Sequence, residues 1–384
     1  MDNVSVITIF YLSGLSESMN NRYILFFLSL LCYCLILLAN ITLIVTIMLD
    51  KNLHEPMYIL LCAFCMNGLY GTTGFFPKFL WDLLFPAHVI SYSGCLLQVQ
   101  VLYSFGGSDV SILAVMAYDR YVAICRPLQY HSIMSKQRLI KLVCYCWFTP
   151  FCLIGVNICL TSRLKLCSPY IARLFCVNWL IVALACFPDE TMVNNIVAYI
   201  TLLFYVFHGV FIVWSYIYII RTCVNSIENR AKFMQTCVPH LFSLITVLFT
   251  FLFDIMNIRF ELKNLPQPFK NFIAIEFLVI PPLMNPLIYG FKLTKIRKRL
   301  VMLFFTKDLI ITTLYSLLMV NPSRFSGLIQ MAGSVLRVKL DPLHVVTERR
   351  KLSNLFFIMA HPQSNVLVSQ MSKRPGKTKC SSGR

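Results

Sequence analysis

Charged residues are scarce in this chain. Asp, Glu, Lys and Arg make up 13% of its 384 residues, against about 25% in a typical soluble domain. Hydrophobic residues make up 58% of the chain, and the mean hydropathy is +0.71. So little charge excludes an ordinary water-soluble globular protein and indicates a membrane protein with several spans of about 20 residues each.

Acidic residues are the rarer of the two charge types. The chain has 16 Asp and Glu against 34 Lys and Arg, which gives a net charge of +18. A membrane protein of this balance is expected to meet anionic lipid at its basic segments. No basic face is interleaved with aromatic residues outside the apolar stretches, so we expect membrane lipid and no nucleic acid as a partner.

The sequence also lacks the short motifs of enzymes and metalloproteins. It has no glycine-rich phosphate loop, no nucleophile–base pattern and no zinc-ligand spacing. Of its 16 cysteines, Cys62 and Cys65 form a CxxC pair, but both lie in an apolar stretch without a second cluster. We therefore expect no enzymatic activity, no metal and no cofactor. The first 22 residues also lack the basic start and apolar core of a cleavable signal peptide.

Seven apolar stretches are long enough to cross a bilayer, and backbone in lipid must satisfy its own hydrogen bonds, which predicts helices. The expected spans are 23–48, 56–76, 96–118, 142–161, 191–220, 237–258 and 271–291. The loops after spans 1, 3 and 5 and the segment after span 7 lie on one side of the membrane and hold 14 Lys and Arg. The segments on the other side, up to residue 270, hold 8. The positive-inside rule therefore puts the N-terminus outside, where the sequon at Asn3 would be open to glycosylation.

The third predicted span ends in the run 116–125, MAYDRYVAIC, which contains Asp119, Arg120 and Tyr121. Ionisable groups at the edge of the hydrocarbon are costly and usually mark function. Further motifs occur in order along the chain. They are Asn40 in span 1, His54-Glu55-Pro56-Met57-Tyr58 before span 2, Pro127-Leu128-Gln129-Tyr130, Ser215-Tyr216, Thr236-Cys237-Val238-Pro239-His240, and Pro282-Leu283-Met284-Asn285-Pro286-Leu287-Ile288-Tyr289.

These motifs together resemble odorant receptors, a family of rhodopsin-like G-protein-coupled receptors, from about residue 23 to about 304. Within that family, the sequence is similar to the fish branch. The resemblance implies an all-α membrane protein, a seven-transmembrane helix bundle with a short amphipathic helix after span 7. The expected parts are an extracellular N-terminus (1–22), the receptor domain (23–291), an amphipathic cytoplasmic helix (292–305) and an atypical basic tail (306–384). We interpret that tail as disordered, or as a mispredicted or read-through extension.

The resemblance implies an inner switch that couples to a heterotrimeric G protein of the stimulatory olfactory type. Asp119 would pair with Arg120 at rest, and activation would move helix 6 and free Arg120. The alternative for Arg120 is a boundary charge that reaches the interface. The other switch residues implied are Tyr121, Tyr216, His240, Asn285, Pro286 and Tyr289. Asn285 and Pro286 would form a hinge or a fixed bend, and His240 is either a switch residue or a structural histidine.

Four cysteines fall in the predicted outer segments, where disulfides persist. Spacing alone leaves three connectivities open. The resemblance implies a bridge between Cys95 and Cys176 and a second between Cys167 and Cys186, which would fix the second outer loop over the bundle.

A small-molecule odorant is the implied ligand, bound in the outer half of the bundle. Family analogy and helical spacing place an apolar pocket, of the kind small molecules usually occupy, at Tyr103, Gly106, Gly107, Ile200, Phe204, Phe251, Ile255 and Ile275. Plain helix packing is the alternative for each of them.

Asp109 lies eleven residues before Arg120 on the same predicted helix, where the family commonly has a Glu. An acid inside the bundle indicates a cation site, a proton site or a neutral hydrogen-bonded side chain. The chain departs from the family at the helix-2 acid, which is Gly68 here, and at the Asp of the outer-loop Phe-Cys-Asp, which is Val177. Asp109 would therefore act without a second acid.

Two other readings stay open at this point. A transporter or channel would show internal repeats or broken helices, and the sequence shows neither. A non-productive receptor retained inside the cell would explain the missing acids and the tail. The receptor reading implies a multi-pass protein of the plasma membrane, in the cilia of olfactory neurons.

Overall fold

The computed structural model describes residues 7–14, 19–224, 237–238, 240–250, 267–293, 295–297 and 299, all within one compact unit, Met1–Thr306. Several predicted features therefore lie outside the described residues: Asn3, Phe251, Ile255, most of the predicted helix 292–305, and the tail 306–384.

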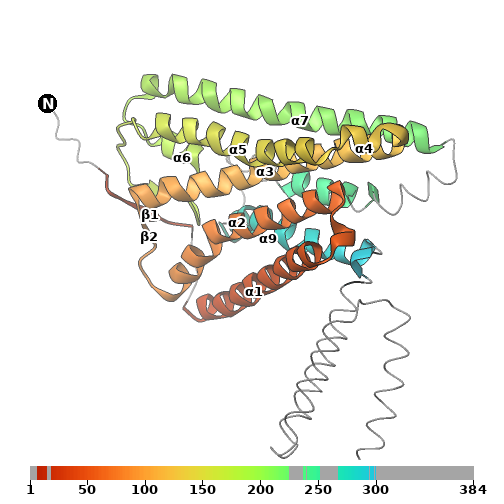
Figure 1. Ribbon diagram of the computed structural model, residues 1–384. Helices are drawn as coiled ribbons and strands as arrows, with labels where there is room; N and C mark the ends of the chain where they lie inside the picture. Colours follow the sequence, from red (N-terminus) through yellow and green to blue (C-terminus); the bar gives the residue numbers. More distant parts are fainter. Residues whose placement is uncertain are drawn as a thin grey trace, which may run out of the picture. The chain divides into compact units, whose positions relative to one another are not determined.

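Six helices of the described part are long and apolar enough to cross a membrane (Figure 1). They are α1 (Met19–Leu49), α2 (Pro56–Leu84), α3 (Tyr92–Cys125), α5 (Lys136–Thr161), α7 (Met192–Val224) and α9 (Gln267–Lys292). A shorter apolar helix, His240–Thr250, lies within the predicted sixth span. Each of the seven predicted spans thus coincides with a helix in the described part.

Short elements connect these helices. On the side where α1 ends are the 3₁₀ helices η1 (Lys51–Leu53) and η2 (Pro127–Gln129) and the single turn α4 (Tyr130–Ile133). On the opposite side are α6 (Asn178–Ala183) and η3 (Pro188–Thr191). Pro56 begins α2, a position where its missing N–H costs nothing. Ser91 caps α3 by accepting a hydrogen bond from the Gly94 N–H at 3.1 Å.

Helix α2 is longer than the sequence predicts: it runs to Leu84, whereas the expected span ends near residue 76. The additional turns contain Lys78 and Asp82. These two residues are four apart on the helix and form an ion pair with each other. The pair offsets the cost of carrying two charges at the end of an apolar helix.

Helix α3 lies at the centre of the bundle. It packs against α2, α5 and α7, while α9 packs against α1 and α2. In the most apolar window of α3, 83% of the residues are buried, compared with 11% in α1 and in α7. Helices α1 and α7 therefore expose apolar side chains on their outer faces, as expected for helices in contact with lipid.

Three loop segments form a small sheet in the order β2–β1–β3. Strand β1 (Ile9–Leu12) pairs antiparallel with β2 (Val89–Ser91) and parallel with β3 (Tyr170–Ile171). Phe10 and Leu12 are buried and alternate with the exposed Ile9 and Tyr11, the period of two of a half-covered strand. The N-terminal segment is thereby tied to the loops on the predicted outer side.

Candidate functional site

The acid–arginine pair at the predicted inner end of α3 forms a buried network. Arg120 donates to Asp119 Oδ2 through Nε at 3.0 Å and also through Nη2. Tyr130, in the turn α4, donates its hydroxyl proton to Asp119 Oδ1 at 2.8 Å. The Asp119 side chain is fully buried, and that of Arg120 is 11% exposed. Both carboxylate oxygens therefore have donors, as a buried charge requires.

Tyr130 entered the sequence analysis only as part of a motif, and its contact with Asp119 was not predicted. The two residues are eleven apart, on elements separated by η2. Burial, followed by the Asp119 carboxylate, raises the pKa of Tyr130, so the phenol stays protonated and able to donate. Tyr121 lies apart from this network, against Trp214 and Tyr218 of α7.

His240 connects three helices. Its Nε2 lies 3.1 Å from the backbone oxygen of Leu113 on α3, and its Nδ1 is hydrogen-bonded to the hydroxyl of Tyr216 on α7. Because a carbonyl oxygen only accepts, Nε2 carries the proton, and in the neutral ring Nδ1 accepts from Tyr216. His240 is 1% exposed. His240 thus joins its own helix to α3 and α7, and moving this helix away from either neighbour would break a buried hydrogen bond.

The prolines of α9 leave backbone carbonyls without their usual partners. Pro286 has no N–H, so the carbonyl four residues earlier, on Pro282, receives no helical hydrogen bond. Asn40 of α1 supplies the missing donor: its Nδ2 lies 2.8 Å from Pro282 O. On the neighbouring helix, Ser243 donates to Asn285 Oδ1 at 2.9 Å. Side chains of two other helices therefore contact α9 at, and one turn before, the residues where a hinge or a fixed bend is predicted.

Gly68, at the position where the resemblance implies a helix-2 acid, lies beside the contact between α1 and α9. A Cβ atom at this position would lie 3.4 Å from Asn40 Oδ1 and 3.5 Å from Pro282 Cβ, which is ordinary van der Waals contact. Steric contact at the Cβ therefore does not require glycine here.

Asp109 is buried beside a cavity of about 10 Å³, which is about the size needed for one water molecule. Asn67 donates from Nδ2 to Asp109 Oδ1 and to Phe105 O, both at 2.8 Å. In the described part of the chain, Asn67 Oδ1 is buried without a hydrogen-bond partner. The cavity is also lined by Asn40 and by Asn285, Cys65, Gly68, Phe64, Phe105, Pro281 and Pro282.

These polar groups around Asp109 suit a cation or a water molecule at the centre of the bundle. Ser111 lies two residues after Asp109 on α3, but its hydroxyl donates to Gly107 O, and its side chain is not among those that line this cavity. Within the described residues, no group of three or more His, Cys, Asp or Glu side chains could hold a metal ion.

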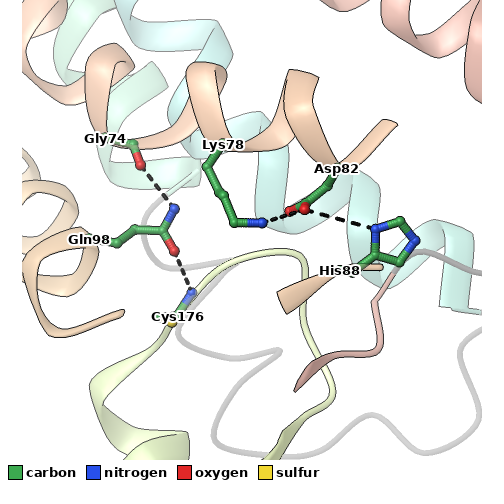
Figure 2. Close-up of polar contacts among 6 residues, drawn as sticks. All are labelled: Gly74, Lys78, Asp82, His88, Gln98 and Cys176. Carbon is green, nitrogen blue, oxygen red and sulfur yellow. Dashed lines mark hydrogen bonds and ion pairs between the residues drawn. The ribbon is translucent and has the colours of Figure 1, made fainter. Parts of the chain in front are cut away.

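Two disulfides lie on the predicted outer side of the bundle: Cys95–Cys176, which joins α3 to the segment before α6, and Cys167–Cys186, which joins the segments before and after α6. This is the connectivity that the resemblance implies. Figure 2 shows Gln98 of α3 between α2 and the segment that contains Cys176. Its Nε2 donates to Gly74 O on α2, and its Oε1 accepts from the Cys176 N–H, both at 3.0 Å. Val177, which replaces the family's Asp, is fully buried against an aromatic cluster.

The ion pair at the outer end of α2 has a third member. His88 Nδ1 lies 3.9 Å from Asp82 Oδ1, and Lys78 contacts the same oxygen (Figure 2). Both ring nitrogens of His88 are buried without a hydrogen-bond partner among the described residues. Burial and the nearby positive charge of Arg22 lower the pKa of His88, against the smaller opposing effect of Asp82.

The residues predicted to line the ligand pocket lie in different surroundings. Tyr103 and Ile275 pack against an aromatic cluster in the predicted outer half that includes Phe75, Phe105 and Phe277. The prediction for Ile200 is wrong: this side chain is 59% exposed on α7 and faces away from the bundle. Since the outward and inward faces of an apolar membrane helix are equally hydrophobic, periodicity did not distinguish them.

The glycine positions and Phe204 also differ from an open pocket. A Cβ at Gly106 would lie 2.8 Å from Phe277 Cζ, and one at Gly107 would overlap the hydroxyl of Tyr205. Aromatic rings thus fill the space beside both glycines. Phe204 lines a different cavity, between α3, α5 and α7.

Comparison with known proteins shows which sequences this chain is similar to. A family model described as olfactory receptor matches residues 28–307. The chain is 35% identical to human olfactory receptor 11H6 over 291 residues, which are 74% of this chain and 86% of that protein. It is 32% identical to human olfactory receptor 6N1 over 301 residues (77% and 95%) and 32% identical to mouse (Mus musculus) olfactory receptor 5G26 over 305 residues (79% and 95%).

Proposed function

The chain belongs to the olfactory receptor family of seven-transmembrane receptors, and from this premise we propose that it binds a small-molecule odorant on its outer side and activates a heterotrimeric G protein on its inner side. It is a multi-pass membrane protein and not an enzyme. The relatives named above are mammalian, and the fish-like branch stays a prediction.

The observation that carries the proposal is the buried network around Asp119. A charge held by an arginine and a tyrosine at the end of the central helix can exchange partners when a neighbouring helix moves. His240 bonds the neighbouring helix to Leu113 of α3 and to Tyr216 of α7. A buried ion pair and a helix held by two hydrogen bonds are the features that support the proposal of a two-state switch.

We further propose the state of this network. With Arg120 bound to Asp119, the guanidinium is unavailable to a G protein, so the arrangement corresponds to rest. An odorant would bind the state in which Arg120 is released more tightly, and that difference in affinity sets how far it can shift the populations.

The odorant site is proposed for the outer half of the bundle, around Tyr103 and Ile275. Both side chains adjoin the aromatic cluster of α2, α3 and α9, and Phe175 of the disulfide-bound loop joins the same cluster. An apolar, aromatic lining beneath a fixed loop suits a small hydrophobic ligand. The stimulatory olfactory G protein, the extracellular N-terminus with glycosylation at Asn3, and a location in olfactory cilia are part of the same proposal.

Cyclic-AMP production tests the function. Cells expressing the full chain, a stimulatory olfactory G protein and a reporter are exposed to an odorant panel, and surface staining is measured in parallel. A ligand-dependent signal supports the receptor proposal over a transporter or channel, which would give current or flux without G protein. Absence of the chain from the surface would favour the non-productive alternative, and a truncation at residue 305 would show whether the tail causes it.

A further inference from the structure

A groove between α3, α5 and α7 is separate from the switch and from the proposed odorant site. Its volume is about 290 Å³, near the lower limit for sites that bind small organic molecules. The lining is almost entirely apolar or aromatic: Ala114, Val115, Tyr118, Leu142, Tyr145, Phe204, Phe207, His208 and Phe211. Size and lining fit a small hydrophobic ligand.

The groove opens toward the lipid. Its floor is made by Ala114 and Val115 of the central helix, which are 4% and 6% exposed. Its rim includes Phe207 of α7 and Tyr145 of α5, which are 65% and 39% exposed. Tyr145 lies nine residues into α5, about 13 Å from the inner end of that helix at 1.5 Å per residue. A ligand would therefore enter from the hydrocarbon region of the bilayer.

One polar pair interrupts this apolar lining. His208 Nδ1 lies 2.9 Å from the carbonyl oxygen of Phe204, so Nδ1 must donate. In the neutral ring Nε2 then accepts, and Tyr145, whose oxygen lies 3.1 Å away, donates its only proton to it. The tyrosine proton is thus used within the protein. In the described part of the chain no donor contacts the Tyr145 oxygen, and the side chain is 39% exposed, so the oxygen lone pairs can accept a hydrogen bond from a ligand.

Because the Tyr145 hydroxyl has no proton left to donate, its oxygen can form a hydrogen bond only with a ligand that donates one. A hydroxyl can donate to Tyr145, whereas an ester, ether or ketone of the same shape has no proton to give. The surrounding hydrocarbon offers no competing water, so a donor that reaches this oxygen gains a hydrogen bond it would otherwise lack.

We infer that the groove between α3, α5 and α7 is a second small-molecule site, which takes a compact lipophilic alcohol from the bilayer and holds its hydroxyl at Tyr145. The site does not depend on the proposed odorant pocket or on G-protein coupling. Tyr118 lines the groove and directly precedes Asp119, so the occupant would contact the segment that carries the switch.

Photolabelling tests this site in the full chain reconstituted in phosphatidylcholine nanodiscs. The probe is a medium-chain alcohol bearing a diazirine, and the matched probe has a methyl group in place of the hydroxyl. The alcohol should label peptides of α5 and α7 saturably, and the matched probe should label them only in proportion to its concentration. Tyr145→Phe should weaken the apparent affinity of the alcohol roughly 3- to 10-fold, the effect of losing one neutral hydrogen bond.

Tyr23→Phe is the matched control, because Tyr23 is a 49%-exposed tyrosine on α1, which contributes no residue to the groove; it should leave the labelling unchanged. Equal labelling by both probes, or unchanged affinity in Tyr145→Phe, would overturn the inference, since bulk lipid chains would then account for the occupancy. A further arm adds cholesterol to the nanodiscs. Displacement of the probe by cholesterol would overturn the assignment to a compact alcohol, and persistence of saturable labelling would support it.

Discussion

Removing the Tyr130 hydroxyl should raise signalling in the absence of odorant. Tyr130→Phe keeps the ring but removes the donor to Asp119 Oδ1, a 2.8 Å bond to a fully buried carboxylate. A hydrogen bond to a charged group contributes about 1.5–3 kcal/mol. If the bond exists only at rest, its loss shifts the balance of resting and active states roughly 10- to 150-fold. A receptor that is about 1% active would become about 10–60% active.

The assay is basal cyclic-AMP production, normalised to receptor at the cell surface. Tyr170→Phe serves as the control, because Tyr170 is 63% exposed in the outer sheet, on the predicted opposite side of the membrane. The reasoning would be refuted by unchanged or lower basal signalling in Tyr130→Phe at equal surface level. That result would mean that the phenol stabilises both states equally or favours the active one.

Three further predictions concern stability and the buried acid. Asn40→Ala should lower the unfolding free energy by about 1–3 kcal/mol, because the Pro282 carbonyl loses its donor. Thermal unfolding in detergent measures this loss, and a variant as stable as wild type would contradict the prediction. Asp109→Asn should abolish any sodium dependence of thermal stability, and a dependence that survives would exclude this carboxylate as a cation ligand. Since burial lowers the pKa of His88, the folded chain binds fewer protons than the unfolded chain below about pH 6.5, so stability should fall as the pH drops through that value. His88→Gln should flatten this part of the pH profile, and identical profiles for wild type and His88→Gln would disprove the assignment.

The helices could be read from the sequence because their signal is strong. Long apolar runs admit few structures in lipid other than helices, and six of the predicted spans overlap long helices. The predicted span 56–76 ends before α2 does, because a helix can continue past an apolar stretch where its charged residues pair with each other, as Lys78 and Asp82 do across one turn. The three-stranded sheet was also missed, since strands of two to four residues carry too little pattern to detect.

The polar contacts of the site were harder to predict than the residues that make them. Asp119, Arg120 and His240 were identified by their motifs. The contact of Tyr130 with Asp119 was not, because it depends on where the chain places the turn α4 after the end of α3. Likewise, Asn40 was noted as a motif residue, and its role became clear only when it was found beside the carbonyl that Pro286 leaves unpaired. Such contacts join residues far apart in the chain, and spacing within one helix does not reveal them.

The ligand side shows the limit of helical periodicity in a membrane protein. Ile200 was assigned to the interior because it lies four residues from Phe204, yet it is 59% exposed. In water the polar face of a helix identifies its outside, but in lipid both faces are apolar, and the signal disappears. The disulfide pairing likewise came from the resemblance, because four outer cysteines allow three connectivities.

The central claim, that release of Arg120 from Asp119 couples an outer ligand to an inner G protein, is tested most directly with Arg120→Ala. Odorant-evoked cyclic AMP should be lost in this variant, while surface staining and odorant binding to intact cells stay within a few-fold of wild type. Odorant-evoked cyclic AMP of wild-type size in Arg120→Ala, at the same surface level, would contradict the account.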